Sequence, residues 1–163
     1  MIWVTGDTHG DWIHRVNMDS FPEQREMSKD DYVIILGDFG IWRDSPQQRW
    51  YLNWLEEKHF TTLFIDGNHE NYDILDSYPV EEWHGGKVHF IKPSIIHLMR
   101  GQIFDIDGLR VFTFGGAASH DISDGVLEID DPRVKEWRDD PDKMYRINHI
   151  SWWEREMPKP KKR

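Results

Sequence analysis

Three short apolar runs, each followed closely by glycine and a polar residue, constrain the fold of this chain more than any other feature. The runs cover 2–4, 32–36 and 63–65, and the residues after them include Gly6-Asp7, Gly37-Asp38 and Gly67-Asn68. An apolar run without polar alternation is typical of a strand that is buried on both faces. The three runs therefore predict strands that lie inside a sheet.

A helix is expected between the second and third of these strands. Ser45 and Pro46 have the form of an N-cap followed by a first helical residue. Trp50, Trp54 and Leu55 follow at helical spacing within the stretch 46–58. Because strand, helix and strand follow one another, we expect the flanking strands to pair in parallel.

The second half of the chain has a different pattern. Short runs predict strands at 88–91, 95–98, 102–106 and 109–114, and Asp107-Gly108 between the last two is a hairpin signal. Further helices are expected from 69 or 70 to before 79, at 133–138 and at 151–156. The pattern predicts an α/β fold with a mixed β-sheet, in one domain over 1–158. The basic residues of 159–163 are expected to form a solvated tail.

Charge and composition exclude several classes of protein. The formal net charge is −10, which argues against holding nucleic acid by charge alone. There is no cysteine, so a disulfide scaffold, a thiolate zinc site and a cysteine nucleophile are excluded. No apolar run approaches the roughly 18 residues of a membrane span. We expect a cytoplasmic protein without a membrane partner. Nucleic acid stays open as a substrate, because metal ions in a site can override the local charge.

Side chains that bind metals follow all three predicted strands. Asp7 and His9 follow the first strand, Asp38 the second, and Asn68 and His69 the third. Ligands of open α/β sheets collect at the carboxyl ends of the strands. Carboxylate and imidazole groups without thiolates suit Mn, Fe, Zn or a similar divalent ion. A two-metal site at this edge of the sheet would stabilise both the attacking and the leaving oxygen of a phosphate.

The ordered set of motifs resembles the calcineurin-like metallophosphoesterase family. The matching stretches are Gly6-Asp7-Thr8-His9-Gly10, Gly37-Asp38 and Gly67-Asn68-His69-Glu70. Three later stretches resemble a bacterial and phage-type branch of the family, and they cover 98–101, 114–121 and 151–158.

This resemblance implies a fold, an activity and a role for each matching residue. The fold would be a mixed β-sheet sandwich flanked by helices. The activity would be hydrolysis of phosphomono- or diesters, such as phosphorylated small molecules, by metal-activated water. Two divalent ions are implied: Asp7 and His9 would bind the first, Asn68 the second, and Asp38 both. His69 would stand outside the metal shell near the leaving oxygen, as the catalytic general acid or as a charge stabiliser.

Two further carboxylates have two readings that the sequence leaves open. Asp66 and Glu70 are expected either to orient the metal-binding groups or to serve as turn and helix-start carboxylates.

The sequence departs from the family pattern after Gly115-Gly116. Family members carry further histidine ligands there, including a Gly-His-x-His motif, and this chain has no such motif. We therefore expect a C-terminally shortened domain with a weaker second metal site, in which His120 is a substitute ligand. A homo-oligomer is expected to cover surface left by missing strands. The alternative function is that of a catalytically impaired module that binds a metal or a phosphate, or pairs with another chain.

Overall fold

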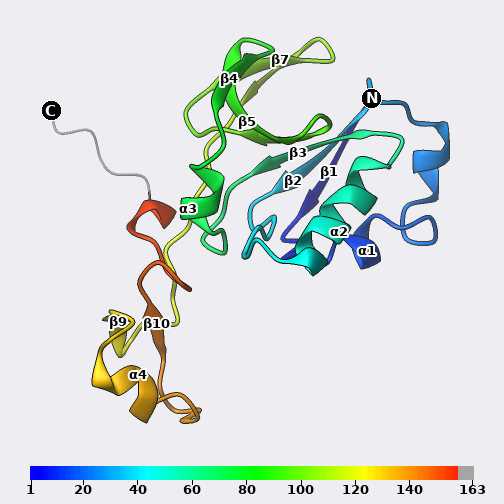
Figure 1. Cartoon of the computed structure of the whole chain (residues 1–163). Helices are drawn as coiled ribbons and strands as arrows, with labels where there is room; N and C mark the ends of the chain where they lie inside the picture. The colour runs from blue at the N-terminus through cyan, green and yellow to red at the C-terminus, as the bar shows by residue number, and fades with distance from the viewer. Residues whose placement is uncertain (158–163) are drawn as a thin grey trace, which may run out of the picture.

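The structure is a computed structural model that describes residues 1–157, so the expected tail at 159–163 lies outside the described residues. The elements follow in chain order (Figure 1). They are β1 (Ile2–Gly6), α1 (Trp12–Arg15), η1 (Pro22–Glu26), β2 (Tyr32–Leu36), α2 (Pro46–Glu56), β3 (Thr61–Ile65), α3 (Tyr72–Leu75), β4 (Val80–Trp83), β5 (Gly86–Lys92), β6 (Ile95–Leu98), β7 (Ile103–Ile106), β8 (Leu109–Phe112), β9 (Gly125–Leu127), α4 (Pro132–Glu136), β10 (Tyr145–Ile147) and η2 (Glu154–Glu156).

A six-stranded mixed sheet forms the centre of the molecule. Its spatial order is β1-β2-β3-β6-β5-β4. The first four of these strands run parallel, while β5 is antiparallel to both β6 and β4. The predicted α/β class and mixed sheet are confirmed. The parallel part places the carboxyl ends of β1, β2 and β3 next to one another.

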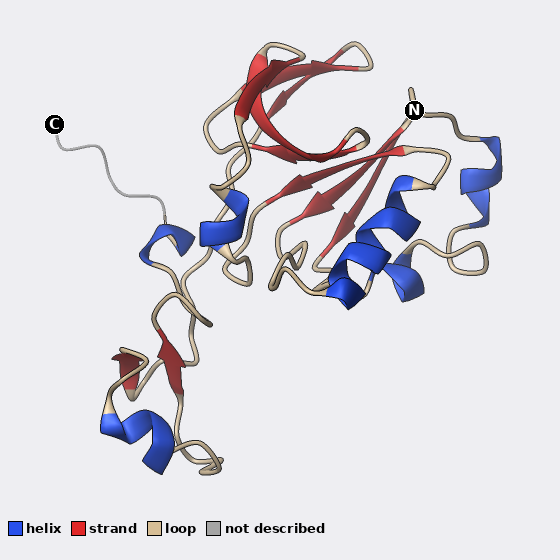
Figure 2. Ribbon diagram, in the orientation of Figure 1, coloured by secondary structure: helices blue, strands red, loops and turns tan. Residues whose placement is uncertain are grey.

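Neighbouring residues of the central strands point into two different cores. Ile35 of β2 packs with Trp12 of α1 and Leu55 of α2, whereas Ile34 packs with Phe104 of β7. The first core lies under the two helices, which cover one face of the sheet (Figure 2). The second core lies under the β7-β8 hairpin. Burial on both faces explains why the strand sequences are continuously apolar.

Several local predictions are confirmed. The helix after Ser45 begins at Pro46, and the Ser45 hydroxyl accepts a hydrogen bond from the backbone N–H of Gln48. The β7-β8 hairpin turns at Asp107 and Gly108, which both have positive φ angles of 49° and 76°. Such a turn matches the twist of the strands that it joins.

Other local predictions are wrong. The helix expected from 69 or 70 is confined to Tyr72–Leu75, because Asn71 caps it by accepting from the N–H of Ile74. The stretch 151–156 contains a short 3₁₀ turn at Glu154–Glu156 instead of a helix. The strands β4, β9 and β10 were not predicted, since each is interrupted or begun by glycine or charged residues and none contains a continuous apolar run of three residues.

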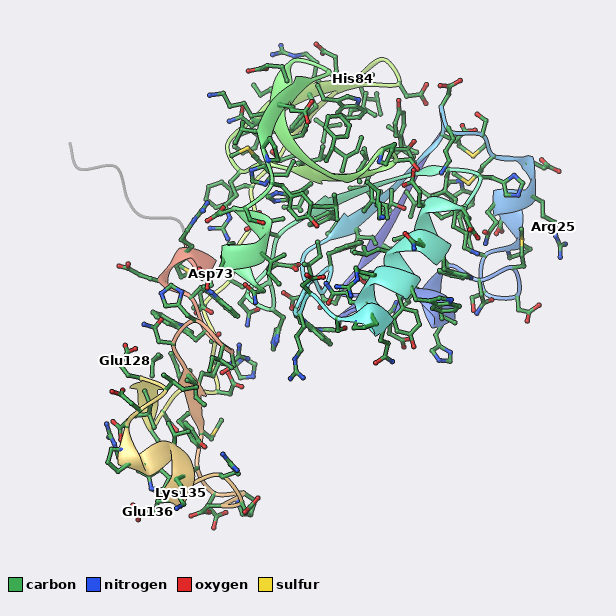
Figure 3. All side chains as sticks on the ribbon, in the orientation of Figure 1. Arg25, Asp73, His84, Glu128, Lys135 and Glu136 are labelled. Carbon is green, nitrogen blue, oxygen red and sulfur yellow. The ribbon has the colours of Figure 1, made fainter. Side chains whose placement is uncertain are left out.

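Residues 117–157, here called the C-terminal arm, extend away from the sheet (Figure 1). Within the arm, β9 and β10 pair in parallel. The arm returns to the body at Asp73 of α3, which is labelled in Figure 3. The Asp73 carboxylate contacts His149 Nδ1 and accepts from the Trp153 indole N–H, both at 2.8 Å. Among residues 1–157, no helix has the length and apolar character needed to span a bilayer.

Candidate metal centre

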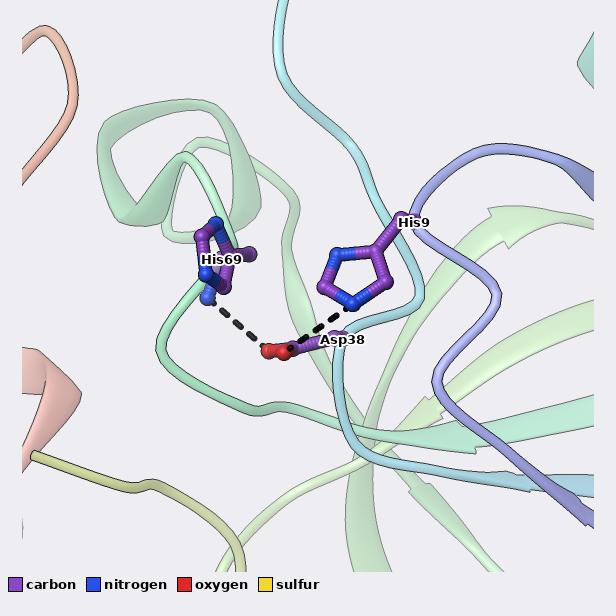
Figure 4. Close-up of side chains that lie close together, drawn as sticks. All are labelled: His9, Asp38 and His69. Atoms are coloured by element: carbon purple, nitrogen blue, oxygen red, sulfur yellow. Dashed lines mark hydrogen bonds and ion pairs between the residues drawn. The ribbon is translucent and has the colours of Figure 1, made fainter. Parts of the chain in front are cut away.

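The loops after β1, β2 and β3 bring His9, Asp38 and His69 together (Figure 4). One potential ligand atom from each residue lies within 4.8 Å of the other two. His9 Nε2 is 3.7 Å from Asp38 Oδ2, and the His69 backbone N–H donates to Asp38 Oδ1 at 2.9 Å. The two imidazole rings meet edge to face at 5.0 Å. Within the described part of the chain, this is the one group of three or more histidine, aspartate or glutamate side chains that is so close.

The backbone at three of the predicted ligands adopts an unusual conformation. Asp7, His9 and Asp38 have φ angles of 32°, 47° and 44°. Positive φ is sterically unfavourable for residues with a Cβ atom and concentrates at functional sites. The surrounding fold therefore holds these three residues in place at a cost in local stability.

A glycine allows the close approach of the second and third loops. A Cβ atom on Gly67 would lie 1.9 Å from Asp38 Oδ1 and 2.6 Å from the Asp38 backbone nitrogen. No side chain fits there without moving Asp38. The close contact with Asp38, the predicted bridging carboxylate, thus explains why residue 67 is a glycine.

Asp7 and Asn68 lie beside the cluster rather than inside it. Both line a cavity of about 530 Å³, to which Asp38 also contributes. The buried Asn68 donates its amide N–H to the Ser119 hydroxyl at 3.3 Å, so its amide oxygen is the atom that could bind a cation. The five predicted metal and catalytic residues therefore surround one region at the sheet edge.

Glu70 fixes the loop that carries Asp38. Its carboxylate is 1% exposed and accepts from the backbone N–H groups of Phe39, Gly40 and Ile41 at 2.6–3.1 Å. Burial raises the pKa of Glu70 to about 8, against the opposing effect of these three N–H groups. Among the described residues, this carboxylate therefore contacts the Asp38 loop and none of the predicted metal-binding side chains.

Asp66 anchors the start of the third loop. Its buried carboxylate contacts His97 Nε2 at 3.0 Å, the Tyr72 hydroxyl at 2.9 Å and the Arg100 guanidinium. Burial acts to raise the pKa of Asp66, but the hydrogen bond and charge of His97 and the charge of Arg100 outweigh it and lower the pKa to about 2. The carboxylate is therefore ionised and held from several sides.

Arg146 contacts the cluster and was not predicted from the sequence. Arg146 of β10 is 7% exposed, and its Nη2 donates to His69 Nε2 at 3.2 Å. Asp121 pairs with the same guanidinium at 2.9 Å. Burial lowers the pKa of His69, and the Arg146 charge lowers it further. His120 is exposed and does not belong to the His9, Asp38 and His69 cluster.

The donor groups of this region fit a divalent metal ion. The carboxylates of Asp7 and Asp38, the imidazole of His9 and the amide oxygen of Asn68 are oxygen and nitrogen donors without thiolates. Such sets suit Mn, Fe or Zn ions. The unusual backbone angles at three of these residues agree with a site that is held ready for a ligand.

Comparisons with known proteins point in the same direction. The family model for calcineurin-like phosphoesterases matches residues 1–162. A lariat debranching enzyme from Schizosaccharomyces pombe is 27% identical over 109 residues, which are 58% of this chain and 22% of that enzyme. Lariat debranching enzyme A from Xenopus laevis is 27% identical over 143 residues, which are 78% of this chain and 26% of that enzyme. The chain thus spans about a quarter of the length of these curated relatives. No solved structure gives a significant match.

Proposed function

This chain belongs to the calcineurin-like phosphoesterase family, and we propose that it hydrolyses phosphomono- or diesters with divalent metal ions held at the ends of β1, β2 and β3. The observation that carries the proposal is the convergence of His9, Asp38 and His69 within 4.8 Å. Asp7 and Asn68 line the adjoining cavity. Family membership alone would leave open whether these side chains meet in this chain.

Each residue of the site receives a separate role in this proposal. Asp7 and His9 bind the first ion, Asn68 binds the second, and Asp38 binds both. When bound, divalent ions lower the pKa of water and neutralise charge on the phosphate. Manganese is the metal that we propose to test first. The second site has fewer protein donors, and we expect it to be the weaker one.

His69 is proposed to serve the leaving group. Hydrolysis forms a phosphorus–oxygen bond from water and breaks the bond to the leaving oxygen, which then takes a proton. His69 borders a second cavity, and its Nε2 accepts a hydrogen bond from Arg146, so the neutral ring carries its proton on Nδ1. A proton donor at this border lowers the barrier most for leaving groups that are poor on their own.

The relatives named as lariat debranching enzymes make a nucleic-acid diester one substrate to examine. The alternative is the impaired module that binds one metal ion or a phosphate without turnover. Residues 1–163 contain no Gly-His-x-His motif, which is the observation that raises this alternative.

Hydrolysis of two aryl phosphates by the metal-stripped chain tests the proposal. We expect p-nitrophenyl phosphate or its bis-ester to be hydrolysed once Mn²⁺ is added. Asp38→Ala is expected to lower the rate at least about 100-fold, since it removes the one ligand shared by both ions. Asp19→Ala is the matched control, because Asp19 is an exposed aspartate on a turn and lines neither cavity.

Turnover that is absent with Mn²⁺ in the intact chain would overturn the enzymatic proposal. If calorimetry then found a single metal site that Asp38→Ala abolishes, the binding module would be supported instead.

A further inference from the structure

A second cavity is lined by His69 and lies between the body and the C-terminal arm. Its volume is about 720 Å³, which is in the range of small-molecule sites. The body contributes Trp42 and Tyr51, and the arm contributes Tyr145, Arg146 and Ile150. The candidate catalytic histidine and residues of the arm therefore line the same cavity.

Arg146 places a buried positive charge at the inner end of this cavity. Its guanidinium pairs with Asp121, donates to the Ser151 carbonyl at 3.0 Å and donates to His69 Nε2 at 3.2 Å. Among residues 1–157, hydrogen bonds to Ser151, His69 and Asp121 use three of its five N–H groups. A guanidinium binds phosphate oxygens more strongly than it binds a neutral imidazole nitrogen. The Asp121 side chain that pairs with it is 40% exposed, so water reaches this ion pair.

The outer part of the cavity has aromatic and aliphatic walls. Trp42 is 43% exposed, and its indole N–H donates to the His69 carbonyl at 2.8 Å, so one edge of its ring is fixed beside the site. Ile150 on the opposite, arm side is 50% exposed. A flat aromatic group can stack on an exposed indole. A short alkyl group has no ring to stack and gains little binding energy from the indole. Arg43 adds a further positive charge to the lining.

We propose that this cavity binds the leaving group of the substrate and that this group is a flat aromatic ring, such as a nucleoside base or an aryl group. Arg146 then binds the phosphate at the inner end of the cavity. The inference rests on the proposed function, because it assigns the orientation of a phosphoester at that site. It makes Trp42 a determinant of specificity and Arg146 a phosphate-binding residue delivered by the arm.

Binding of two phosphonates to the full-length chain loaded with Mn²⁺ tests this inference without requiring turnover. Phenylphosphonate and methylphosphonate share the anionic group, cannot be hydrolysed as esters and differ in the ring. By calorimetry, we expect phenylphosphonate to bind at least 10-fold more tightly. Trp42→Ala is expected to remove most of that preference, whereas Trp42→Phe, which keeps a ring, is expected to retain it. Trp50→Ala is the control, since Trp50 is an exposed tryptophan of α2 that does not line the cavity.

The phosphate end is tested with variants of the arginine. Arg146→Gln is expected to weaken both phosphonates at least 10-fold, and Arg146→Lys to recover part of the loss because it keeps the charge. Arg133→Gln, which changes an exposed arginine elsewhere on the arm, is expected to have no effect. Circular dichroism and thermal unfolding establish that each variant is folded.

Equal affinity for the two phosphonates in the intact chain would overturn the aromatic site. Binding of neither phosphonate would overturn it as well, and unchanged binding to a folded Arg146→Gln variant would overturn the role of the arginine. Phosphonate binding that follows the expected pattern without ester hydrolysis would support this site while refuting the enzymatic function.

Discussion

Replacing Gly67 by alanine tests the site without altering any group that could bind a metal. The new Cβ atom would lie 1.9 Å from Asp38 Oδ1, whereas ordinary van der Waals contact begins near 3.4 Å. The Asp38 carboxylate must therefore move by about 1.5 Å, and the backbone nitrogen 2.6 Å away leaves the loop little room to follow. Metal–ligand distances tolerate only about 0.2 Å.

We expect Gly67→Ala to weaken Mn²⁺ binding by at least about 10–100-fold and to lower the free energy of unfolding by about 1–3 kcal/mol. Gly86→Ala is the matched control. Its Cβ atom would also meet a close contact, 2.6 Å from the Phe104 ring, in the second core. We expect a similar loss of stability there with unchanged metal affinity.

Calorimetric titration of metal-stripped protein, with urea unfolding in parallel, separates the two effects. Unchanged Mn²⁺ affinity in a folded Gly67→Ala variant would refute the argument that Asp38 is a ligand held by this contact.

Three further predictions concern stability. Glu70→Ala leaves three buried N–H groups of 39–41 without their acceptor, and urea unfolding should show a loss of about 3–5 kcal/mol; a loss below about 1 kcal/mol would contradict this. Burial and the nearby His97 charge lower the pKa of His89 to about 4. As the pH falls from 6.5 toward 4, this imidazole is protonated in the unfolded chain but not in the folded chain, so the folded chain loses stability. This contribution is about 2 kcal/mol between pH 7 and 4.5, and a His89→Gln variant with the same pH dependence as the parent would refute it. Ser45→Ala should cost about 1 kcal/mol, because it removes the cap of α2, and an unchanged thermal midpoint would speak against it.

Local signals explain which parts of the fold were predictable. The strands at 32–36 and 95–98 and the start of the helix at Pro46 agree with the structure residue by residue. Each depends on a continuous apolar run or on a cap next to the element that it begins. The meeting of His9, Asp38 and His69 was also foreseeable, because parallel strands present their carboxyl ends at one edge.

Contacts over long sequence distances explain what was missed. Arg146 is 77 positions from His69, and it reaches the site through an arm whose strands have only three residues. No periodic pattern marks such strands. Asp66 was considered as an orienting or turn residue, but its partners His97 and Arg100 come from a strand and a loop that the sequence did not connect to it.

Glu70 shows a related difficulty. The sequence left it as either an orienting group or a helix-start carboxylate. In the structure it binds the backbone after Asp38 and precedes the helix, which begins two residues later at Tyr72. A carboxylate that folds back onto another loop is not distinguished from a helix cap by its neighbours in the sequence.

Anomalous diffraction from crystals grown with Mn²⁺ tests the central claim most directly. We expect a peak at coordination distance from His9 and Asp38, with Asp7 completing the set on the side of the 530 Å³ cavity. A second, weaker peak that shares Asp38 would agree with the weaker second site. The absence of any peak near Asp38, or strong peaks only elsewhere on the surface, would contradict the account.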